Sequence, residues 1–178
     1  TKYGRNPDRL KIMPGLFVTV GETESEAKKK FQVLQDLIHP EIGIAMIERK
    51  MGVDLKDMDI DGQLPSIEPS AVLSSRVDQM IDTAKREGLT IRGLYQKFAA
   101  SRGHFAIVGS PTQIADHMQQ WFEEDAADGF NFMAPIFPGG LEDFVNLVVP
   151  ELQRRGLFRT KYESNMLRIN LGLPMLTS

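Results

Sequence analysis

The sequence has no cysteine, and only one of its 178 residues is tryptophan and three are tyrosine. Without cysteine, the chain can form no disulfide framework, no thiolate nucleophile and no zinc–cysteine site. An excess of charge of one sign is also lacking, because 21 basic residues against 24 acidic ones give a formal net charge of −3. This balance provides no electrostatic basis for binding nucleic acid. The lack of cysteine fits a reducing compartment, and we expect a cytoplasmic protein.

Long hydrophobic runs are missing as well. No apolar run approaches the roughly 18 residues of a transmembrane helix, so we expect no association with a membrane. The polar start, TKYGRNPDRLKIMPG, leads straight into a strand pattern, and we expect no signal peptide. With 42% hydrophobic and 25% charged residues, the composition is ordinary for a globular protein. The length is sufficient for one domain with a hydrophobic core.

The most informative pattern that is present is a strand, a capped helix and a second strand. An apolar, partly β-branched run at 104–108 is followed by Ser110, which with Gln113 forms a capping box for a helix over 111–124. A second apolar run follows at 130–135. Two buried strands joined by a helix predict a βαβ unit, and therefore a parallel sheet.

A further strand–helix unit lies nearer the start of the chain, with a strand over 16–20 and a helix over 25–37. A third amphipathic helix is expected at 141–154. Between the units lies a mostly helical insertion, residues 40–101, with helices expected at 42–51, 74–87 and 91–100. A connection of this length usually has a function, such as covering a site.

Three strands alone make a poor parallel sheet, because both edges are open and both faces need cover. The pattern therefore predicts a part of a larger (β/α) barrel or doubly wound domain. In such sheets the chemistry lies at the carboxyl ends of the strands. We look for the site at Gly109–Ser110 and at Pro135–Gly140.

An acidic run at 54–61, followed by Gly62, has some features of a calcium-binding loop. Such a loop needs a bidentate glutamate at its twelfth position, near which this sequence has Ser66. We interpret the run as a solvated loop and expect no metal site.

Three segments resemble the C-terminal part of the bacterial-luciferase-like, flavin-dependent monooxygenases, in particular the branch of nitrilotriacetate, EDTA and dibenzothiophene-sulfone monooxygenases. They are LKIMPGLFVTVGETESEA (10–27), the long segment that begins RGHFAIVGSPTQIADHMQQWFEE and ends GLFRTKY (102–162), and the closing LRINLGLP (167–174). Together they cover most of the chain outside the insertion, and the second segment is the most specific.

The resemblance implies a fold, namely the C-terminal portion of a TIM (β/α)8 barrel, with about strands six to eight and their helices. On this basis residues 1–178 form a partial TIM-barrel domain, divided as follows: a strand–helix unit at 1–39, a helical insertion or lid at 40–101, two strand–helix units at 102–156 and a C-terminal tail at 157–178. The remaining N-terminal barrel segment would be a partner of this piece.

The resemblance also implies an activity. The chain would belong to an oxidoreductase, a two-component monooxygenase that uses reduced FMN as a cosubstrate, O2 and a separate NAD(P)H:FMN reductase. Its substrate would be a small organic molecule such as an aminopolycarboxylate or an organosulfur compound, and we expect a homo-oligomer. Two alternatives stay open: a non-catalytic flavin- or deazaflavin-binding relative, and an inactive fragment that lacks the main flavin site.

Two residues are predicted to take part in catalysis. Arg102 ends the insertion directly before the strand at 104–108, and a similar arginine in alkanesulfonate-oxidising relatives is placed to meet an anion at the barrel mouth. A guanidinium suits a carboxylate, sulfonate or phosphate because its donors form a fork of fixed charge. His104 could donate a hydrogen bond to the substrate or the flavin, or could be a packed structural residue.

Four residues are predicted to bind the cofactor: Phe17, Ser110, Phe137 and Gly139. Ser110 begins a helix whose free amides could bind an anion, although simple capping is the alternative. Gly139 lies in a Pro-Gly-Gly loop that permits close approach of a ligand to the backbone, and Phe137 is the aromatic residue expected to face a pocket. Gly15 and Phe17 stand where the alkanesulfonate branch carries Arg and His, which argues against a sulfonate substrate.

Overall fold

The structure is a computed structural model that describes residues 4, 6, 10–65, 75–101, 103–173 and 175. In chain order its helices and strands are β1 (Gly15–Val20), α1 (Glu24–Asp36), α2 (Pro40–Met51), α3 (Ser75–Glu87), α4 (Ile91–Ala100), β2 (Phe105–Gly109), α5 (Pro111–Glu123), β3 (Asn131–Met133), α6 (Gly139–Asp143), the π-helical turn η2 (Phe144–Val148), α7 (Val149–Arg154) and α8 (Leu167–Asn170). Among the described residues, no helix is long and apolar enough to cross a bilayer.

The three strands form one parallel sheet in the order β2-β1-β3. β1 pairs with β2 over its whole length, from Leu16 opposite Phe105 to Val20 opposite Gly109. β1 pairs with the shorter β3 only over its first half, from Gly15 to Phe17. The predicted parallel sheet is therefore confirmed.

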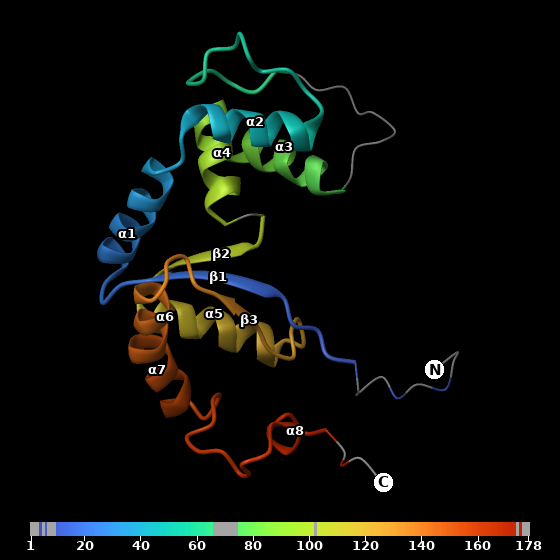
Figure 1. The fold of residues 1–178 in the computed structure, drawn as a ribbon, viewed down its shortest axis with the longest axis vertical. Helices are drawn as coiled ribbons and strands as arrows, with labels where there is room; N and C mark the ends of the chain where they lie inside the picture. The colour runs from blue at the N-terminus through green and yellow to red at the C-terminus, as the bar shows by residue number, and fades with distance from the viewer. Residues whose placement is uncertain are drawn as a thin grey trace.

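The order of the strands adds something that the sequence did not predict. The helix α5 connects β2 to β3, but the two strands are not neighbours, because β1 lies between them. The crossover from β1 to β2 and the crossover from β2 to β3 thus run in opposite directions across the sheet. When two crossovers have the same handedness but run in opposite directions across a sheet, they lie on opposite faces of that sheet. Accordingly, α1 and the insertion lie on one side of the sheet and α5 to α7 on the other (Figure 1).

One face of the sheet carries the main core of the sheet unit. Along β1, Leu16, Val18 and Val20 point to this face and are at most 3% exposed. They pack with the apolar residues of the helices on that side: Ile114, Ala115, Phe144, Val148 and Leu152. This alternation follows from the two-residue period of a strand.

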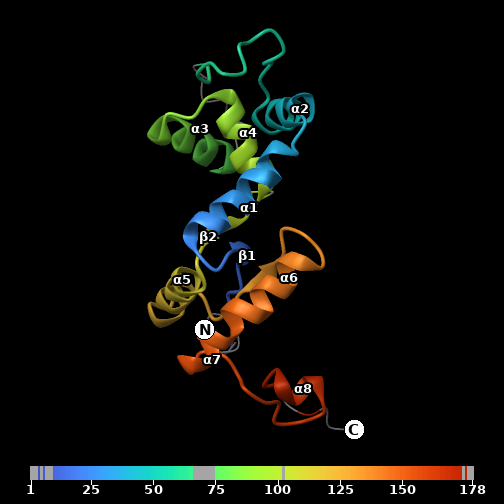
Figure 2. The ribbon, with the colours of Figure 1, turned by 90° about the vertical axis from the view of Figure 1, so that its left-hand side faces the viewer.

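The insertion has a second, separate core. Its buried members come from α2, from the loop after it and from α3 and α4: Ile47, Met51, Leu55, Val77, Met80, Ala84, Ile91, Leu94 and Tyr95. The close approach of α2 to α4 depends on Gly43, because a Cβ at this position would overlap the Tyr95 ring. The insertion is thus a small helical unit with its own interior, joined to the sheet unit through α1 and through the segment before β2 (Figure 2).

Local signals account for the helix boundaries. The Thr23 side chain accepts from the amide of Glu26 and caps α1. Ser110 and Gln113 form the predicted capping box of α5, with the Ser110 amide donating to Gln113 Oε1 at 2.9 Å. The helix expected at 141–154 is present but is broken by η2, where the Val149 amide donates to the carbonyl of Phe144. Pro150 follows at once, and its missing N–H explains why regular α-helical bonding is interrupted there.

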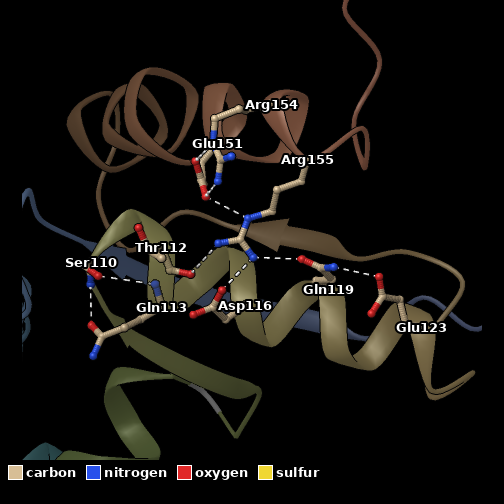
Figure 3. Close-up of polar contacts among 9 residues, drawn as sticks. All are labelled: Ser110, Thr112, Gln113, Asp116, Gln119, Glu123, Glu151, Arg154 and Arg155. Carbon is tan, nitrogen blue, oxygen red and sulfur yellow. Dashed lines mark hydrogen bonds and ion pairs between the residues drawn. The ribbon is translucent and has the colours of Figure 1, made fainter.

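A partly buried ion-pair network fixes α7 against α5 (Figure 3). Arg155, whose side chain is only 12% exposed, contacts Glu151 at 2.8 Å and Asp116 at 2.7 Å. Its guanidinium also donates to Gln119 Oε1 at 2.9 Å. The two adjacent arginines, Arg154 and Arg155, hold the pKa of Glu151 at about 2, through hydrogen bonds to its carboxylate.

Two expectations about burial are corrected. The strand predicted at 104–108 is found at 105–109, but Phe105 and Ala106 are exposed because β2 is an edge strand of the described sheet. The strand predicted at 130–135 is reduced to Asn131–Met133, and none of its three residues is fully buried. Both edges of the described sheet are open, as expected for part of a larger sheet.

Candidate functional site

One candidate site is a groove between the insertion and the sheet unit, with a volume of about 730 Å³. Helices α1, α3 and α4 form its walls, and β2 with the segment before it forms the remainder. Its apolar lining includes Phe31, Phe98, Ala106 and Val108. Volumes in this range are typical of pockets for small molecules and cofactors.

The groove carries a cluster of charged side chains from two helices of the insertion. Lys97 Nζ lies 2.5 Å from one carboxylate oxygen of Glu87, and Arg86 Nη2 lies 3.3 Å from the other. These two cations hold the pKa of Glu87 below its usual value, and the hydrogen bond from Lys97 has the larger effect. The Glu87 carboxylate therefore stays ionised near neutral pH. Two positive charges against one negative charge leave this wall of the groove suited to an anion.

Buried hydroxyl groups border the same groove. Ser101 is 4% exposed and donates to the carbonyl of Lys97 at 3.3 Å, while Thr83 is 7% exposed. Together with Lys97 and Arg86 they place hydrogen-bonding groups along α3 and α4, opposite the apolar surface of β2. A site with polar groups on one wall and apolar groups on the other can orient a ligand that has both a polar and an apolar part.

His104 lines the groove at the amino end of β2. Its ring lies against Gly15, because a Cβ at position 15 would be only 2.6 Å from His104 Nδ1. Its backbone amide donates to the carbonyl of Ser101 at 2.9 Å. Arg102 lies outside the described residues, although Ser101 and Gly103 on either side of it line the groove.

The predicted site residues lie at two different ends of the sheet. His104 lies at the amino end of the parallel sheet, whereas Ser110 follows the carboxyl end of β2 and Gly139 follows β3. The sequence showed only that these residues flank strands. The whole length of β2 therefore lies between His104 and the carboxyl end of the sheet, where Ser110 and Gly139 are found.

At the carboxyl end, the predicted anion site at Ser110 has two features that favour capping. The Ser110 hydroxyl already accepts from the Gln113 amide, which is one of the free amides that an anion would need. The Gln113 side chain also donates to the carboxylate of Glu24 at 2.9 Å, and this negative charge opposes a second anion. The pKa of Glu24 is lowered by its hydrogen bond with Lys28, so the carboxylate is ionised.

The other predicted cofactor residues occupy three different environments. Phe17 is 8% exposed and lies in the middle of β1, opposite Ala106 and Met133. Phe137 is 74% exposed in the loop after β3. Gly139 is the first residue of α6, where an added Cβ would meet nothing within 4 Å. The structure brings none of these three into the groove.

Several residues with functional potential were missed by the sequence analysis. Lys97, Glu87 and Arg86 look like ordinary surface charges in the sequence, because the contact of Lys97 with Glu87 joins two different helices, α4 and α3. Thr19 is 3% exposed on β1, on the same face as Val108, and its hydroxyl has no hydrogen-bond partner in the described part of the chain. Its alternation with the buried Val18 and Val20 predicts a side chain on the opposite face of the strand, so the sequence held no signal that this threonine is buried.

His117 was also missed. It lies on α5 between Phe105 and Trp121, with ring centroids 5.0 Å and 5.3 Å away. Burial lowers its pKa, and its Nε2 has no partner among the described residues. The ring is therefore a neutral member of an aromatic cluster, on the face of the sheet away from the insertion.

Comparison with known proteins shows to which proteins this chain is similar. No family model matches the chain. Its homologues are nevertheless flavin-dependent monooxygenases of the luciferase-like family, and the chain corresponds to a C-terminal part of their TIM barrel. This agrees with the three-stranded parallel sheet and its open edges.

Particular relatives make the relationship specific. The chain is 52% identical over 174 residues to nitrilotriacetate monooxygenase component A of Aminobacter aminovorans, a match that covers 97% of the chain and 38% of that protein. The crystal structure of DmoA from Hyphomicrobium sulfonivorans matches with a TM-score of 0.78 at 28% identity, over 96% of the chain and 35% of DmoA. Riboflavin lyase, solved with modified FMN and riboflavin, matches with a TM-score of 0.66 at 28% identity, over 96% of the chain and 37% of that protein. The chain thus spans about two fifths of the length of these relatives.

Proposed function

We propose that this chain is the C-terminal part of a two-component monooxygenase that uses reduced FMN and O2 to oxidise a small anionic organic substrate. The observation that carries the proposal is the groove, in which Lys97 and Arg86 face the apolar side chains of β2. The 52% identity to nitrilotriacetate monooxygenase component A supports a substrate with carboxylate groups. The insertion, residues 40–101, would act as the lid that covers the site.

The groove suits the chemical features of FMN and of such a substrate. Phe31, Phe98 and Val108 offer apolar surface for a flat ring, and Lys97 offers a cation for a phosphate or a carboxylate. The flavin, when bound, would supply the electrons that activate O2. The residues of this chain would bind and orient the substrate, and the helices of the insertion would exclude water from it.

His104 keeps its proposed role at one end of this groove, whereas the role of Arg102, which lies outside the described residues, stays a prediction. The imidazole of His104 is exposed and lies within the lining, so it can donate a hydrogen bond to a bound anion. A separate NAD(P)H:FMN reductase would deliver the reduced flavin, as the designation "component A" of the relative suggests.

The proposal can be tested in a chimera in which this chain replaces the matching 174-residue segment of nitrilotriacetate monooxygenase component A. We expect O2 consumption that depends on nitrilotriacetate, on FMN and on an NADH-driven flavin reductase. A folded chimera that consumes no O2 in response to substrate contradicts the proposal. Unchanged far-UV circular dichroism would show that the barrel has formed.

The Lys97→Ala substitution in the same chimera tests the site itself. Losing one charge-assisted hydrogen bond should raise KM for the carboxylate substrate about tenfold, with a smaller effect on kcat. Lys28→Ala is the matched control, because Lys28 is an exposed lysine that pairs with Glu24 on α1, outside the lining of the groove. Equal KM values for the Lys97 and Lys28 variants would remove the groove from the substrate site.

A further inference from the structure

The Lys30 side chain joins the two helical layers of the molecule at the carboxyl end of β1. Lys30 lies on α1, and its Nζ atom is 2.9 Å from the carboxylate of Asp143, which ends α6 on the other side of the sheet. The same Nζ atom lies 3.3 Å from the carbonyl oxygen of Val20, the last residue of β1, and 2.9 Å from the carboxylate of Glu26. A lysine ammonium group has three donors, and these three acceptors match that number.

The contacts continue into the turn that follows β1. The other carboxylate oxygen of Glu26 accepts from the Glu22 amide at 3.0 Å. The Gly21 amide donates to the carbonyl of Gly109, at the end of β2, at 3.3 Å. Position 21 has no room for a side chain, because an added Cβ would lie 2.6 Å from a backbone nitrogen of α1. The start of α1 is thus tied to the carboxyl ends of both β1 and β2.

The apolar contacts of α1 are few in comparison. Of its 13 residues, Ala27 is the one that is buried. Burying a single methyl group contributes much less to stability than burying a leucine or phenylalanine side chain. The three contacts of Lys30 are therefore well placed to hold α1 against the sheet and against α6.

The position of α1 matters because this helix is a wall of the groove. Phe31 and Gln35, which follow Lys30 on the same helix, line the groove. Since an α-helix is rigid over such a short stretch, a shift of Lys30 relative to β1 would shift Phe31 by nearly the same amount. In a binding site, a misplacement of about 1 Å can cost a factor of about a hundred in rate.

We propose that Lys30 is a positioning residue for the flavin site, which fixes the wall of the groove that carries Phe31. This role rests on the proposed function, because it takes the groove as the place where reduced FMN binds. Lys30 lies outside the lining of the groove, so it acts through the position of α1 and does not touch the flavin. Its positive charge also separates two carboxylates, those of Glu26 and Asp143, which would otherwise repel each other.

Two substitutions in the chimera separate positioning from a simple effect of charge. Lys30→Met and Asp143→Ala both remove the contact between α1 and α6, but they change the net charge in opposite directions. Each should raise the Kd for reduced FMN, measured by anaerobic titration, about tenfold, with a smaller effect on kcat. The double variant should bind little worse than either single variant, because both remove the same contact. Tighter or unchanged binding of the anionic FMN by Asp143→Ala would overturn the proposal.

Two further variants are the controls. Lys28→Met removes a lysine from the same helix that pairs with Glu24 of α1 itself, so the Kd should stay at the parent value. Lys30→Arg keeps a cation within reach of Asp143 and should restore most of the affinity. Equal Kd values for Lys28→Met and Lys30→Met would show that Lys30 has no positioning role.

Hydrogen exchange in the 178-residue chain provides a measurement that needs no flavin. Exchange of the α1 amides should become faster in Lys30→Met and also in Asp143→Ala, although Asp143 lies on a different helix. Lys28→Met should have the smaller effect, because it removes a contact within α1 alone. Unchanged exchange of α1 in Asp143→Ala would contradict the positioning role. A chimera that binds reduced FMN but consumes no O2 would contradict the proposed function instead, and the comparison of Kd values would still decide the role of Lys30.

Discussion

The insertion and the sheet unit differ in how completely each buries its own apolar surface. The insertion encloses a core of nine buried residues between α2, α3 and α4, including Tyr95 and Leu94 at 1% and 0% exposure. The sheet unit has a comparable core on one face only, and its edge strand β2 leaves Phe105 and Ala106 exposed. A helical unit can close on itself within one chain segment, whereas a parallel sheet needs further strands and cover on both faces.

This difference explains why a part of a barrel can still contain a well-packed region. Helical bonding is satisfied within each segment, so the insertion needs only its own three helices. The sheet unit depends on pairing between segments far apart in the sequence, and the open edges of β2 and β3 show where more pairing is needed. We therefore expect the insertion to be the more self-sufficient unit.

The largest expected effect comes from truncating one leucine in each core. Leu94→Ala and Leu16→Ala should each cost about 2–5 kcal/mol, because both residues are at most 1% exposed. In a hydrogen-exchange experiment, Leu94→Ala should lower the protection of amides in α2 to α4 and leave that of β1 and α5 unchanged. Leu16→Ala should lower the protection of β1 and α5 and leave that of α2 to α4 unchanged. Leu37→Ala, at 75% exposure, is the control with little effect. Loss of protection in both units in either variant would show that they unfold as one.

Two glycine substitutions within the insertion should change its stability by smaller amounts, one lowering it and the other raising it. Gly43→Ala should destabilise the insertion by about 1–3 kcal/mol, because the new methyl group would overlap the Tyr95 ring. Gly93→Ala should stabilise it by about 0.5–1 kcal/mol, because Gly93 is helical and its Cβ would meet only Leu89 and Thr90 at 3.5 Å or more. Thermal unfolding monitored at 222 nm measures both. Similar melting temperatures for the two variants would show that α2 and α4 are not tightly packed.

The smallest expected effect is the response of the sheet unit to acid. The pKa of Glu151 is lowered to about 2 in the folded chain, from an ordinary value of 4.5, by Arg154 and Arg155. The stability it contributes is therefore fully present above pH 4.5 and is lost as the pH falls toward 2. Melting temperatures of the parent chain should fall over this range, and those of Glu151→Gln should fall less. Parallel pH profiles for the two proteins would show that the network between α5 and α7 does not respond to acid in this way.

Much of the local structure was predictable because it depends on residues close together in the sequence. The capping box at Ser110 and Gln113, the helix at 42–51 and the strand at 16–20 were all expected from a few neighbouring residues, and the structure has each of them. The family was recognised for a related reason, because long stretches of sequence around these elements resemble the luciferase-like monooxygenases in residue order and spacing. The position of the site stays a prediction, and two of the predicted residues, His104 and Ser110, lie at opposite ends of the same strand.

The sequence by itself determined where most of the helices and strands lie, and to which family of barrels the chain is similar, although not every boundary. Only the tertiary structure decided that β1 lies between β2 and β3, that the insertion has a core of its own and that Lys97 meets Glu87 in a groove that β2 also lines. The physical reason is the range of the interactions. Capping, helical periodicity and strand alternation act over a few residues, whereas strand order and the groove depend on contacts between residues far apart in the chain.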